Sequence, residues 1–223
     1  MGKNDDNNII DETPEIWGQE FTTESAQVEQ DYNKFADTGE YDETFDKWGY
    51  VAPKKAAELM KKYMSANDSK IIDVACGSGL TGVALSKQGY HNIDGIDIAG
   101  ELLKIAEKTK AYQKLSRVDM QILPLPFEDG VYDAVNFIGA LTYFETTDIL
   151  KDLCRIVRND GYIVFTQRDD IMKNQSYGDL LDEIERQGLW EKVYSSEPEQ
   201  YLPNHPKYRD DIKVQFFVYK VTK

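Results

Sequence analysis

The 223-residue sequence contains little cysteine, histidine or basic charge, with two Cys, two His and 26 Lys and Arg against 40 Asp and Glu. Cys76 and Cys154 form at most one bridge, and a chain of this length needs no disulfide, so we expect two free thiols. No apolar run reaches the ~18 residues that span a bilayer. The opening residues, MGKNDDNN, have neither the apolar core nor the basic flank of a secretory signal. These absences predict a cytoplasmic protein without a membrane partner.

The negative charge is concentrated at the beginning of the chain. Residues 1–46 contain 14 acidic residues and only Lys3 and Lys34, whereas residues 47–223 carry 26 acidic and 24 basic residues. Nucleic acids attract clustered Lys and Arg, and neither part of the chain supplies such a cluster, so we expect no nucleic-acid partner. The composition divides the chain into an acidic, flexible leader (1–20), an aromatic-rich lid and helix (21–65), and a main domain (66–223).

From residue 70 onwards, strand and helix patterns alternate, which is typical of an α/β fold with a parallel sheet covered by helices on both faces. Helices are expected over 51–64, 80–88, 100–110, 146–157 and 177–187. Strands are expected over 71–76, 92–98, 118–122, 132–141, 161–167, 189–196 and 212–221. The last two are joined by a direct link, which favours an antiparallel pair.

A glycine-rich turn, CGSGLTG, follows the first expected strand and precedes a helix, so backbone N–H groups there would face a nucleotide-like ligand. Gly77, Gly79 and Gly82 also have the spacing of dinucleotide enzymes, which keeps an NAD dehydrogenase open as an alternative. Asp73 would repel a pyrophosphate, but it would favour the ammonium and sulfonium of S-adenosylmethionine (SAM). Asp97 is placed to accept the ribose hydroxyls of either cofactor. The turn therefore predicts SAM.

Several segments resemble the class I SAM-dependent methyltransferases, namely DVACGSGL, GIDI, the LPF-EDG-YDAV block and GYIVF. More narrowly, YNKFADTGEYD, WGYVAP, AYQKL and GLWE are similar to the methyltransferase-like protein 27 group. The resemblance implies a Rossmann-like sheet of seven strands in the order 3-2-1-4-5-7-6, with the last strand antiparallel and an N-terminal helical lid. Ala75 stands where the general family has a glycine, and its small methyl group still allows the turn.

The resemblance also implies SAM as cofactor, S-adenosylhomocysteine as product and a set of cofactor-binding residues. These residues follow the first four strands or lie in the lid: Asp73, Gly77, Ser78, Gly79, Asp97, Ile98, Asp119, Met120, Ile138, Gly139, Tyr41, Trp48 and Tyr50. Two alternatives stay open. Asp119 could be a solvated loop carboxylate, and the lid aromatics could pack without touching the cofactor.

The methyl acceptor is less constrained by the sequence. Transfer to nitrogen or sulfur needs only positioning and desolvation, whereas a hydroxyl acceptor usually needs a base or a metal, and neither is evident. By family analogy the acceptor pocket draws on Tyr143, Phe144, Arg168, Tyr177, His205 and Tyr208. Tyrosine faces can hold a cation and Arg168 a carboxylate, which predicts a small, zwitterionic acceptor; pairing of Arg168 with Asp169 or Asp170 is the alternative.

Two other functions also fit these residues. A protein methyltransferase would need an open groove for a peptide, and a SAM-binding regulator would bind the cofactor without methylating anything. The sequence leaves monomer and homodimer open.

Overall fold

The computed structural model describes residues 22–64, 68–144, 146–174 and 177–223, so the expected flexible leader lies outside the described residues. The strands are β1 (Lys70–Val74), β2 (Asn92–Asp97), β3 (Lys114–Arg117), β4 (Tyr132–Phe137), β5 (Val157–Arg168), β6 (Trp190–Ser195), β7 (Glu199–Gln200) and β8 (Lys213–Val221). The helices are α1 (Ser25–Asp37), α2 (Tyr41–Lys47), α3 (Ala52–Tyr63), α4 (Leu80–Lys87), α5 (Gly100–Thr109), α6 (Asp148–Ile156), α7 (Asp169–Asn174) and α8 (Tyr177–Arg186). A short 3-10 turn, Leu141–Tyr143, follows β4.

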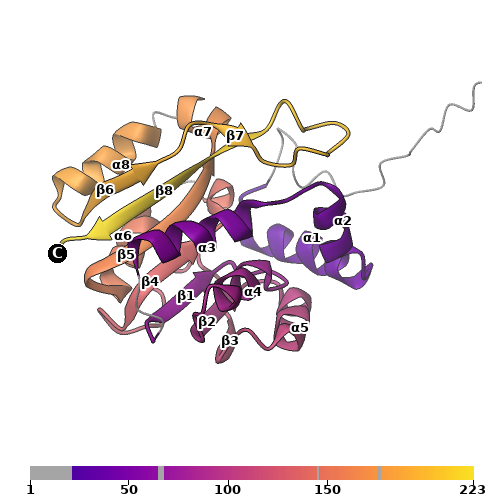
Figure 1. Cartoon of the computed structure of the whole chain (residues 1–223), viewed down its shortest axis with the longest axis horizontal. Helices are drawn as coiled ribbons and strands as arrows, with labels where there is room; N and C mark the ends of the chain where they lie inside the picture. The colour runs from indigo at the N-terminus through magenta and orange to yellow at the C-terminus, as the bar shows by residue number, and fades with distance from the viewer. Residues whose placement is uncertain (1–21, 65–67, 145, 175–176) are drawn as a thin grey trace, which may run out of the picture.

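One mixed sheet runs through the molecule in the order β3-β2-β1-β4-β5-β8-β6 (Figure 1). The five strands β1 to β5 are parallel, and β8 runs antiparallel to β5, β6 and β7. The predicted Rossmann-like order is confirmed, with β8 as the seventh strand of the pattern. The two-residue strand β7, which pairs with β8, was not expected.

Two expected strands were misplaced. The third strand is β3, at residues 114–117, and not residues 118–122; it lies at the sheet edge, where half-exposed residues give no apolar run. The fourth strand ends at Phe137, before the predicted end at residue 141. Gly139 has φ +79°, a left-handed conformation that glycine adopts readily, so the chain leaves the sheet there.

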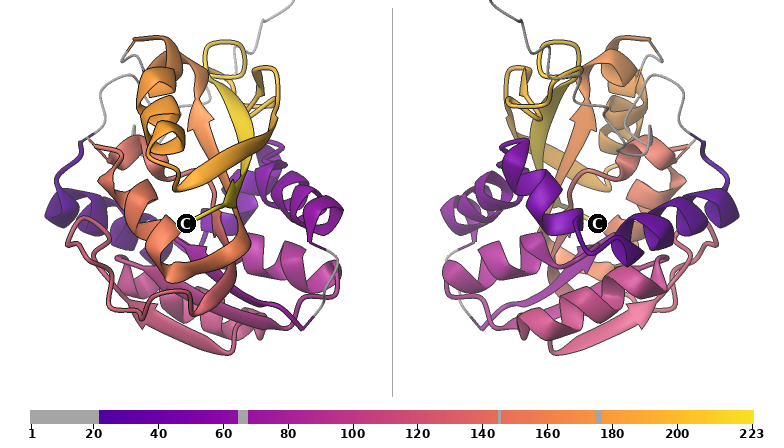
Figure 2. Two further views of the ribbon diagram at one scale, coloured as in Figure 1. Left: turned by 90° about the vertical axis from the view of Figure 1, so that its left-hand side faces the viewer. Right: turned by 90° about the vertical axis from the view of Figure 1, so that its right-hand side faces the viewer.

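Helices cover both faces of the sheet, as expected, and Figure 2 shows the two layers from opposite sides. One hydrophobic cluster joins α3 and α4 to the sheet through residues such as Met60, Leu85 and Val164, which are fully buried. A second cluster joins α6 and α8 to the other face through Leu153, Ile184 and their neighbours.

The N-terminal helices are part of this core. Phe35 of α1 and Phe45 of α2 belong to the same hydrophobic cluster as Ile71 of β1. Residues on both sides of the expected boundary at residue 65 therefore share one hydrophobic core. The helices meet the sheet at the carboxyl ends of its first strands (Figure 1), because residues from both line one pocket.

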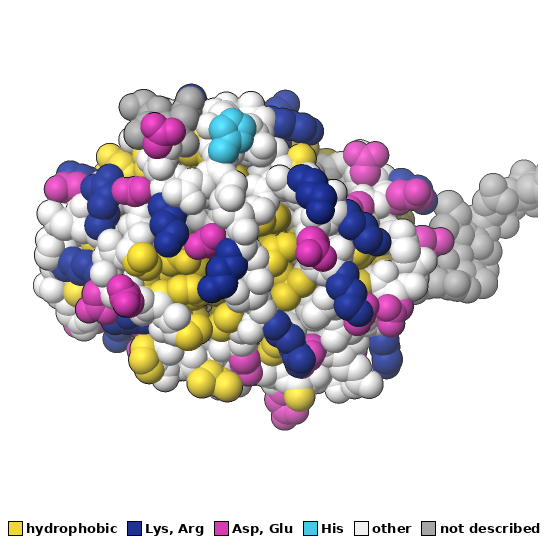
Figure 3. Space-filling view, turned by 90° about the horizontal axis from the view of Figure 1, so that it is seen from below, with side chains coloured by type: hydrophobic (Ala, Val, Ile, Leu, Met, Phe, Trp, Pro, Cys, Tyr) yellow, Lys and Arg dark blue, Asp and Glu magenta, His cyan; other side chains and the backbone are white. Residues whose placement is uncertain are grey.

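The surface seen from below mixes charges of both signs. Figure 3 shows Lys and Arg side chains interspersed with Asp, Glu and apolar side chains on this face. Within the described ranges, none of the helices is both long and apolar enough to span a bilayer.

Candidate functional site

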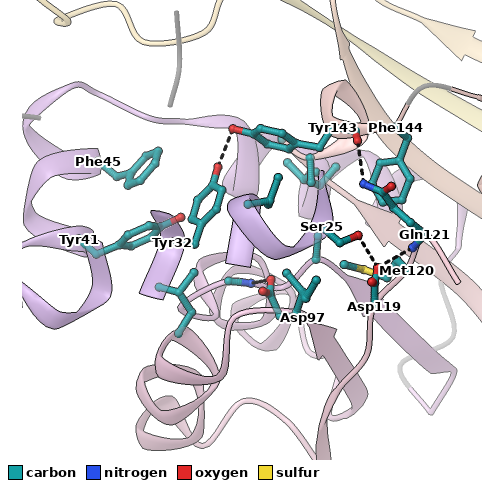
Figure 4. A pocket seen from close by; sticks show the side chains of 18 of the residues that line it. Ser25, Tyr32, Tyr41, Phe45, Asp97, Asp119, Met120, Gln121, Tyr143 and Phe144 are labelled. Atoms are coloured by element: carbon teal, nitrogen blue, oxygen red, sulfur yellow. Dashed lines mark hydrogen bonds between the residues drawn. The ribbon is translucent and has the colours of Figure 1, made fainter. Parts of the chain in front are cut away.

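A pocket lies at the carboxyl ends of β1, β2 and β4 and beside the loop after β3, beneath α1 and α2 (Figure 4). It contains about 700 Å³ of empty space, part of which is open to solvent. Its position fits the rule that open α/β sheets bind ligands outside the carboxyl ends of their strands. We call one part of its wall the carboxylate end, formed by Asp97, Ile98, Asp119 and Met120. We call another part the tyrosine end, formed by Tyr32, Tyr50, Gly139 and Tyr143.

Asp97 is the most enclosed acid of the carboxylate end, with 6% of its surface exposed. Its Oδ2 accepts the backbone N–H of Gly77 at 2.8 Å, and its Oδ1 accepts that of Ala99 at 2.8 Å. Burial raises the pKa of Asp97 to about 6, and the two N–H donors partly oppose that shift. Because each carboxylate oxygen can accept a second hydrogen bond, Asp97 can also receive ligand hydroxyls.

The loop after β3 and the first turn of α1 meet at the same end. The Ser25 hydroxyl donates to Asp119 Oδ1 at 2.9 Å, and the same oxygen accepts the backbone N–H of Gln121 at 3.0 Å. The Gln121 amide in turn donates to the backbone oxygen of Tyr143 at 3.2 Å. These bonds, drawn in Figure 4, join the lid, the β3 loop and the turn after β4 around the pocket.

The tyrosine end is assembled from segments far apart in the chain. The hydroxyls of Tyr32 on α1 and Tyr143 after β4 are hydrogen-bonded at 2.9 Å. The Tyr201 hydroxyl, from the link after β7, donates to that of Tyr50 at 3.4 Å. A Cβ on Gly139 would lie 2.6 Å from the Tyr201 hydroxyl and 2.8 Å from that of Tyr50, so only glycine leaves room for both.

Most of the expected cofactor residues meet at this pocket. The predicted residues that line it are Gly77, Asp97, Ile98, Asp119, Met120, Ile138, Gly139, Tyr41 and Tyr50. Ser78 and Gly79 lie in the turn and are buried, but they do not reach the wall. Trp48 is also off the wall, because its ring packs on Phe45 and His205. The cofactor roles of all these residues remain predictions.

Asp73 lies behind the glycine turn and is 1% exposed, so its side chain does not line the pocket. Its Oδ2 accepts the Tyr112 hydroxyl at 2.6 Å. Burial raises the pKa of Asp73 to about 7, the Tyr112 hydrogen bond lowers it, and the nearby Asp97 charge raises it. Asp73 can therefore act on a ligand through its charge, from behind the turn.

Of the expected acceptor residues, only Tyr143 and Phe144 line the pocket. The Arg168 guanidinium instead pairs with Asp170: Nε donates to Oδ1 at 3.0 Å, and an Nη donates to Oδ2 at 2.7 Å. This is the pairing that the sequence offered as the alternative to binding a carboxylate of the acceptor. Tyr177 begins α8 and packs in the cluster on the opposite face of the sheet.

His205 and Tyr208 also lie away from the wall, and local contacts of His205 account for its position. His205 Nδ1 accepts the backbone N–H groups of Lys207 and Tyr208, each at 3.1 Å. Its ring packs on Trp48 with 4.4 Å between ring centroids, and Asn204 donates to the Trp48 carbonyl at 3.0 Å. The histidine thus holds the link after β7 against the N-terminal helices.

Sequence reasoning missed several lining residues, most of them on α1, α2 or the turns: Ser25, Val28, Tyr32, Phe45, Ala75, Leu102, Gln121 and Ala140. The helical spacing of Ser25, Val28 and Tyr32 on α1 could have indicated a shared face. That signal was weak, because the segment is acidic and has few apolar residues.

The wall of the pocket tests which cofactor it suits. It contains two carboxylates, Asp97 and Asp119, and its described lining residues include no Lys, Arg or His. A pyrophosphate would find no cationic partner among them, whereas a cationic, phosphate-free adenosine derivative would be attracted. The residues present therefore fit SAM better than a dinucleotide. When bound, SAM supplies an electrophilic methyl group on its sulfonium.

Comparison with known proteins agrees with this reading of the fold and site. Residues 72–165 match the methyltransferase domain family. The structure resembles a SAM-dependent methyltransferase of Thermotoga maritima described as a possible histamine N-methyltransferase, with a TM-score of 0.59 and 16% identity over 86% of this chain and 98% of that one. Together, the family match and these similarities support a class I SAM-dependent methyltransferase that uses SAM as its cofactor.

Three curated relatives show how widely this similarity extends. The chain is 28% identical to human methyltransferase-like protein 27 over 171 residues, covering 74% of this chain and 69% of the relative. It is 22% identical to human EEF1A lysine methyltransferase 2, covering 70% and 71%. It is 29% identical to demethylmenaquinone methyltransferase of Staphylococcus saprophyticus, covering 62% of each. These names include both small-molecule and protein substrates.

Proposed function

We propose that this enzyme methylates a nitrogen or sulfur atom of a small molecule that enters the pocket beneath α1 and α2. The observation that carries the proposal is the tyrosine end. Four tyrosines from separate segments, namely Tyr32, Tyr50, Tyr143 and Tyr201, lie at or against one end of a partly open pocket. Such a wall suits a compact ligand held by ring faces and hydroxyls.

The choice of nitrogen or sulfur follows from the groups on the wall. Burial raises the pKa of Tyr143 to about 12 and raises that of Tyr32 well above its usual value, so both are neutral phenols at pH 7. The two carboxylates lie at the other end. An unprotonated amine or a thioether needs no base, since placing it in line and removing water contributes up to ~7–11 kcal/mol.

The position of Arg168 does not support the zwitterionic acceptor that the sequence predicted. We expected Arg168 to hold a carboxylate, but Asp170 occupies its guanidinium with two hydrogen bonds. The proposed acceptor is accordingly neutral or cationic, since tyrosine faces attract a cation and the wall has no described Lys, Arg or His to attract an anion.

A protein acceptor is the second candidate, and the similarity to a lysine methyltransferase supports it. A lysine side chain inserted through the mouth would present the same amine chemistry. The cytoplasmic location and the lack of a nucleic-acid partner remain predictions.

The test is a panel of amines, thioethers, thiols, phenols and lysine peptides, read by formation of S-adenosylhomocysteine with the full chain. We expect turnover with amines or thioethers and none with phenols. A Tyr143→Ala variant should lose that turnover but keep SAM binding. Turnover confined to peptides would favour the protein acceptor, and turnover confined to phenols would contradict the proposal.

A further inference from the structure

Tyr112 lies between α5 and β3 and reaches under the glycine turn. Its hydroxyl donates to Asp73 Oδ2 at 2.6 Å and accepts the backbone N–H of Gly82 at 3.1 Å. One phenol thus joins the end of β1 to the first turn of α4. Neither the glycine motif nor the comparisons assign it a role.

The ring of Tyr112 also accounts for three glycines. A Cβ on Gly82 would lie 2.3 Å from the ring Cζ, one on Gly95 would lie 2.9 Å from ring carbons, and one on Gly79 would lie 3.1 Å from the ring. Contacts under 3.0 Å cannot form without a shift of the backbone or the ring. The third glycine of the G-x-G-x-x-G spacing therefore makes room for a tyrosine, and not for a pyrophosphate.

The surroundings of Asp73 explain what the phenol does. The titratable groups that act on it come from every neighbouring segment: Asp97 at the end of β2, Cys76 in the turn, Tyr50 before α3, and Tyr112. None of these four is a cation. Burial and Asp97 both raise the pKa of Asp73, whereas the Tyr112 hydrogen bond lowers it.

We infer that Tyr112 is a positioning residue that favours the anionic form of Asp73 behind the glycine turn, so that the pocket discriminates between SAM and S-adenosylhomocysteine by charge. The inference rests on the cofactor site described above. Methyl transfer converts the sulfonium to a neutral thioether, and the ligand loses one positive charge. A buried anion behind the turn therefore favours the charged ligand over the product.

The test is calorimetric titration of the full chain with SAM and with S-adenosylhomocysteine at pH 7 and pH 9. The quantity compared is the ratio of the two dissociation constants, Kd for the product over Kd for SAM. The Tyr112→Phe variant keeps the ring but lacks the hydroxyl that donates to Asp73. Without that hydrogen bond Asp73 is protonated more readily, so the ratio should fall about three- to tenfold at pH 7. At pH 9 a larger fraction of Asp73 is ionised in both proteins, and the two ratios should move closer together.

Two further variants separate this role from a structural one. Asp73→Asn keeps an acceptor for the Tyr112 hydroxyl but removes the charge, so its ratio should be low at both pH values. Tyr194→Phe, on β6 at the opposite edge of the sheet, should match the wild type. Equal weakening of both ligands by Tyr112→Phe, or an unchanged ratio in Asp73→Asn, would overturn the inference. Failure of the wild type to bind SAM would instead overturn the cofactor site, and this inference with it.

Discussion

At the carboxylate end of the pocket, residues directly after consecutive strands make the wall, whereas at the tyrosine end two helices and a late link supply it. Asp97 ends β2 and Asp119 follows β3, and backbone N–H groups of the adjoining turns fix both carboxylates. In contrast, Tyr32 and Tyr143 are far apart in the sequence, as are Tyr50 and Tyr201, and each pair meets only through tertiary packing. Local turns thus define the carboxylate end, while long-range packing defines the tyrosine end.

The largest expected effect is at the carboxylate end. Asp97→Ala removes the acceptor of two buried N–H groups and of the proposed ribose hydroxyls, and hydrogen bonds to a charged group contribute ~1.5–3 kcal/mol each. We expect SAM to bind at least ~100-fold more weakly by calorimetry. Asp119→Ala is the matched control, with an expected loss of ~10-fold at most, because Asp119 is half-buried. Equal losses in both variants would contradict the account of this end.

A smaller effect, on thermal stability, is expected at Gly139, where the chain leaves β4. Gly139→Ala forces a left-handed residue at φ +79° and pushes a Cβ against the hydroxyls of Tyr50 and Tyr201. The conformation alone costs ~1–2 kcal/mol, which lowers the melting temperature by roughly 2–8 °C for a domain of this size. Gly100→Ala, where a Cβ would meet nothing within 4 Å, is the control and should melt within about 2 °C of the wild type. Similar melting of the two variants would show that the tyrosine end does not require glycine.

The smallest effect concerns the hydrogen bond between Tyr32 and Tyr143. Tyr32→Phe and Tyr143→Phe should each lower the free energy of unfolding by ~0.5–1.5 kcal/mol. Because both substitutions break one shared bond, the double variant should cost less than the sum of the two, with a coupling of ~1 kcal/mol in urea denaturation. SAM affinity should change less than ~3-fold. Strict additivity would mean that the two hydroxyls act independently.

The difference between the carboxylate end and the tyrosine end also determines how much of the site could be predicted from the sequence. The buried strands β1, β2 and β4 have apolar runs, which located the glycine turn after β1 and Asp97 at the end of β2. Ile138 was assigned from the family resemblance. The edge strand β3 was misplaced because only part of its surface is buried. Sequence patterns report burial and local turns, and these suffice for the sheet and for the carboxylate end.

The tyrosine end could be predicted only in part: the family resemblance implied Tyr50, Gly139 and Tyr143 as site residues, but Tyr32 and Tyr201 were not expected. Tyr32 lies in an acidic segment with weak helical periodicity, and nothing near Tyr201 in sequence indicates that it faces Gly139. Arg168 and His205 were assigned to the acceptor pocket by family analogy. Their nearest partners, Asp170 and the backbone of 207–208, satisfy them instead. Which groups a side chain meets depends on packing that local patterns do not record.

The central claim is that the pocket beneath α1 and α2 binds a cationic, phosphate-free adenosine derivative. The most direct measurement is calorimetric titration of the full chain with SAM and, in parallel, with NADH. The account predicts saturable binding of one SAM per chain and no measurable heat with NADH. Saturable binding of NADH, or the absence of SAM binding, would contradict it.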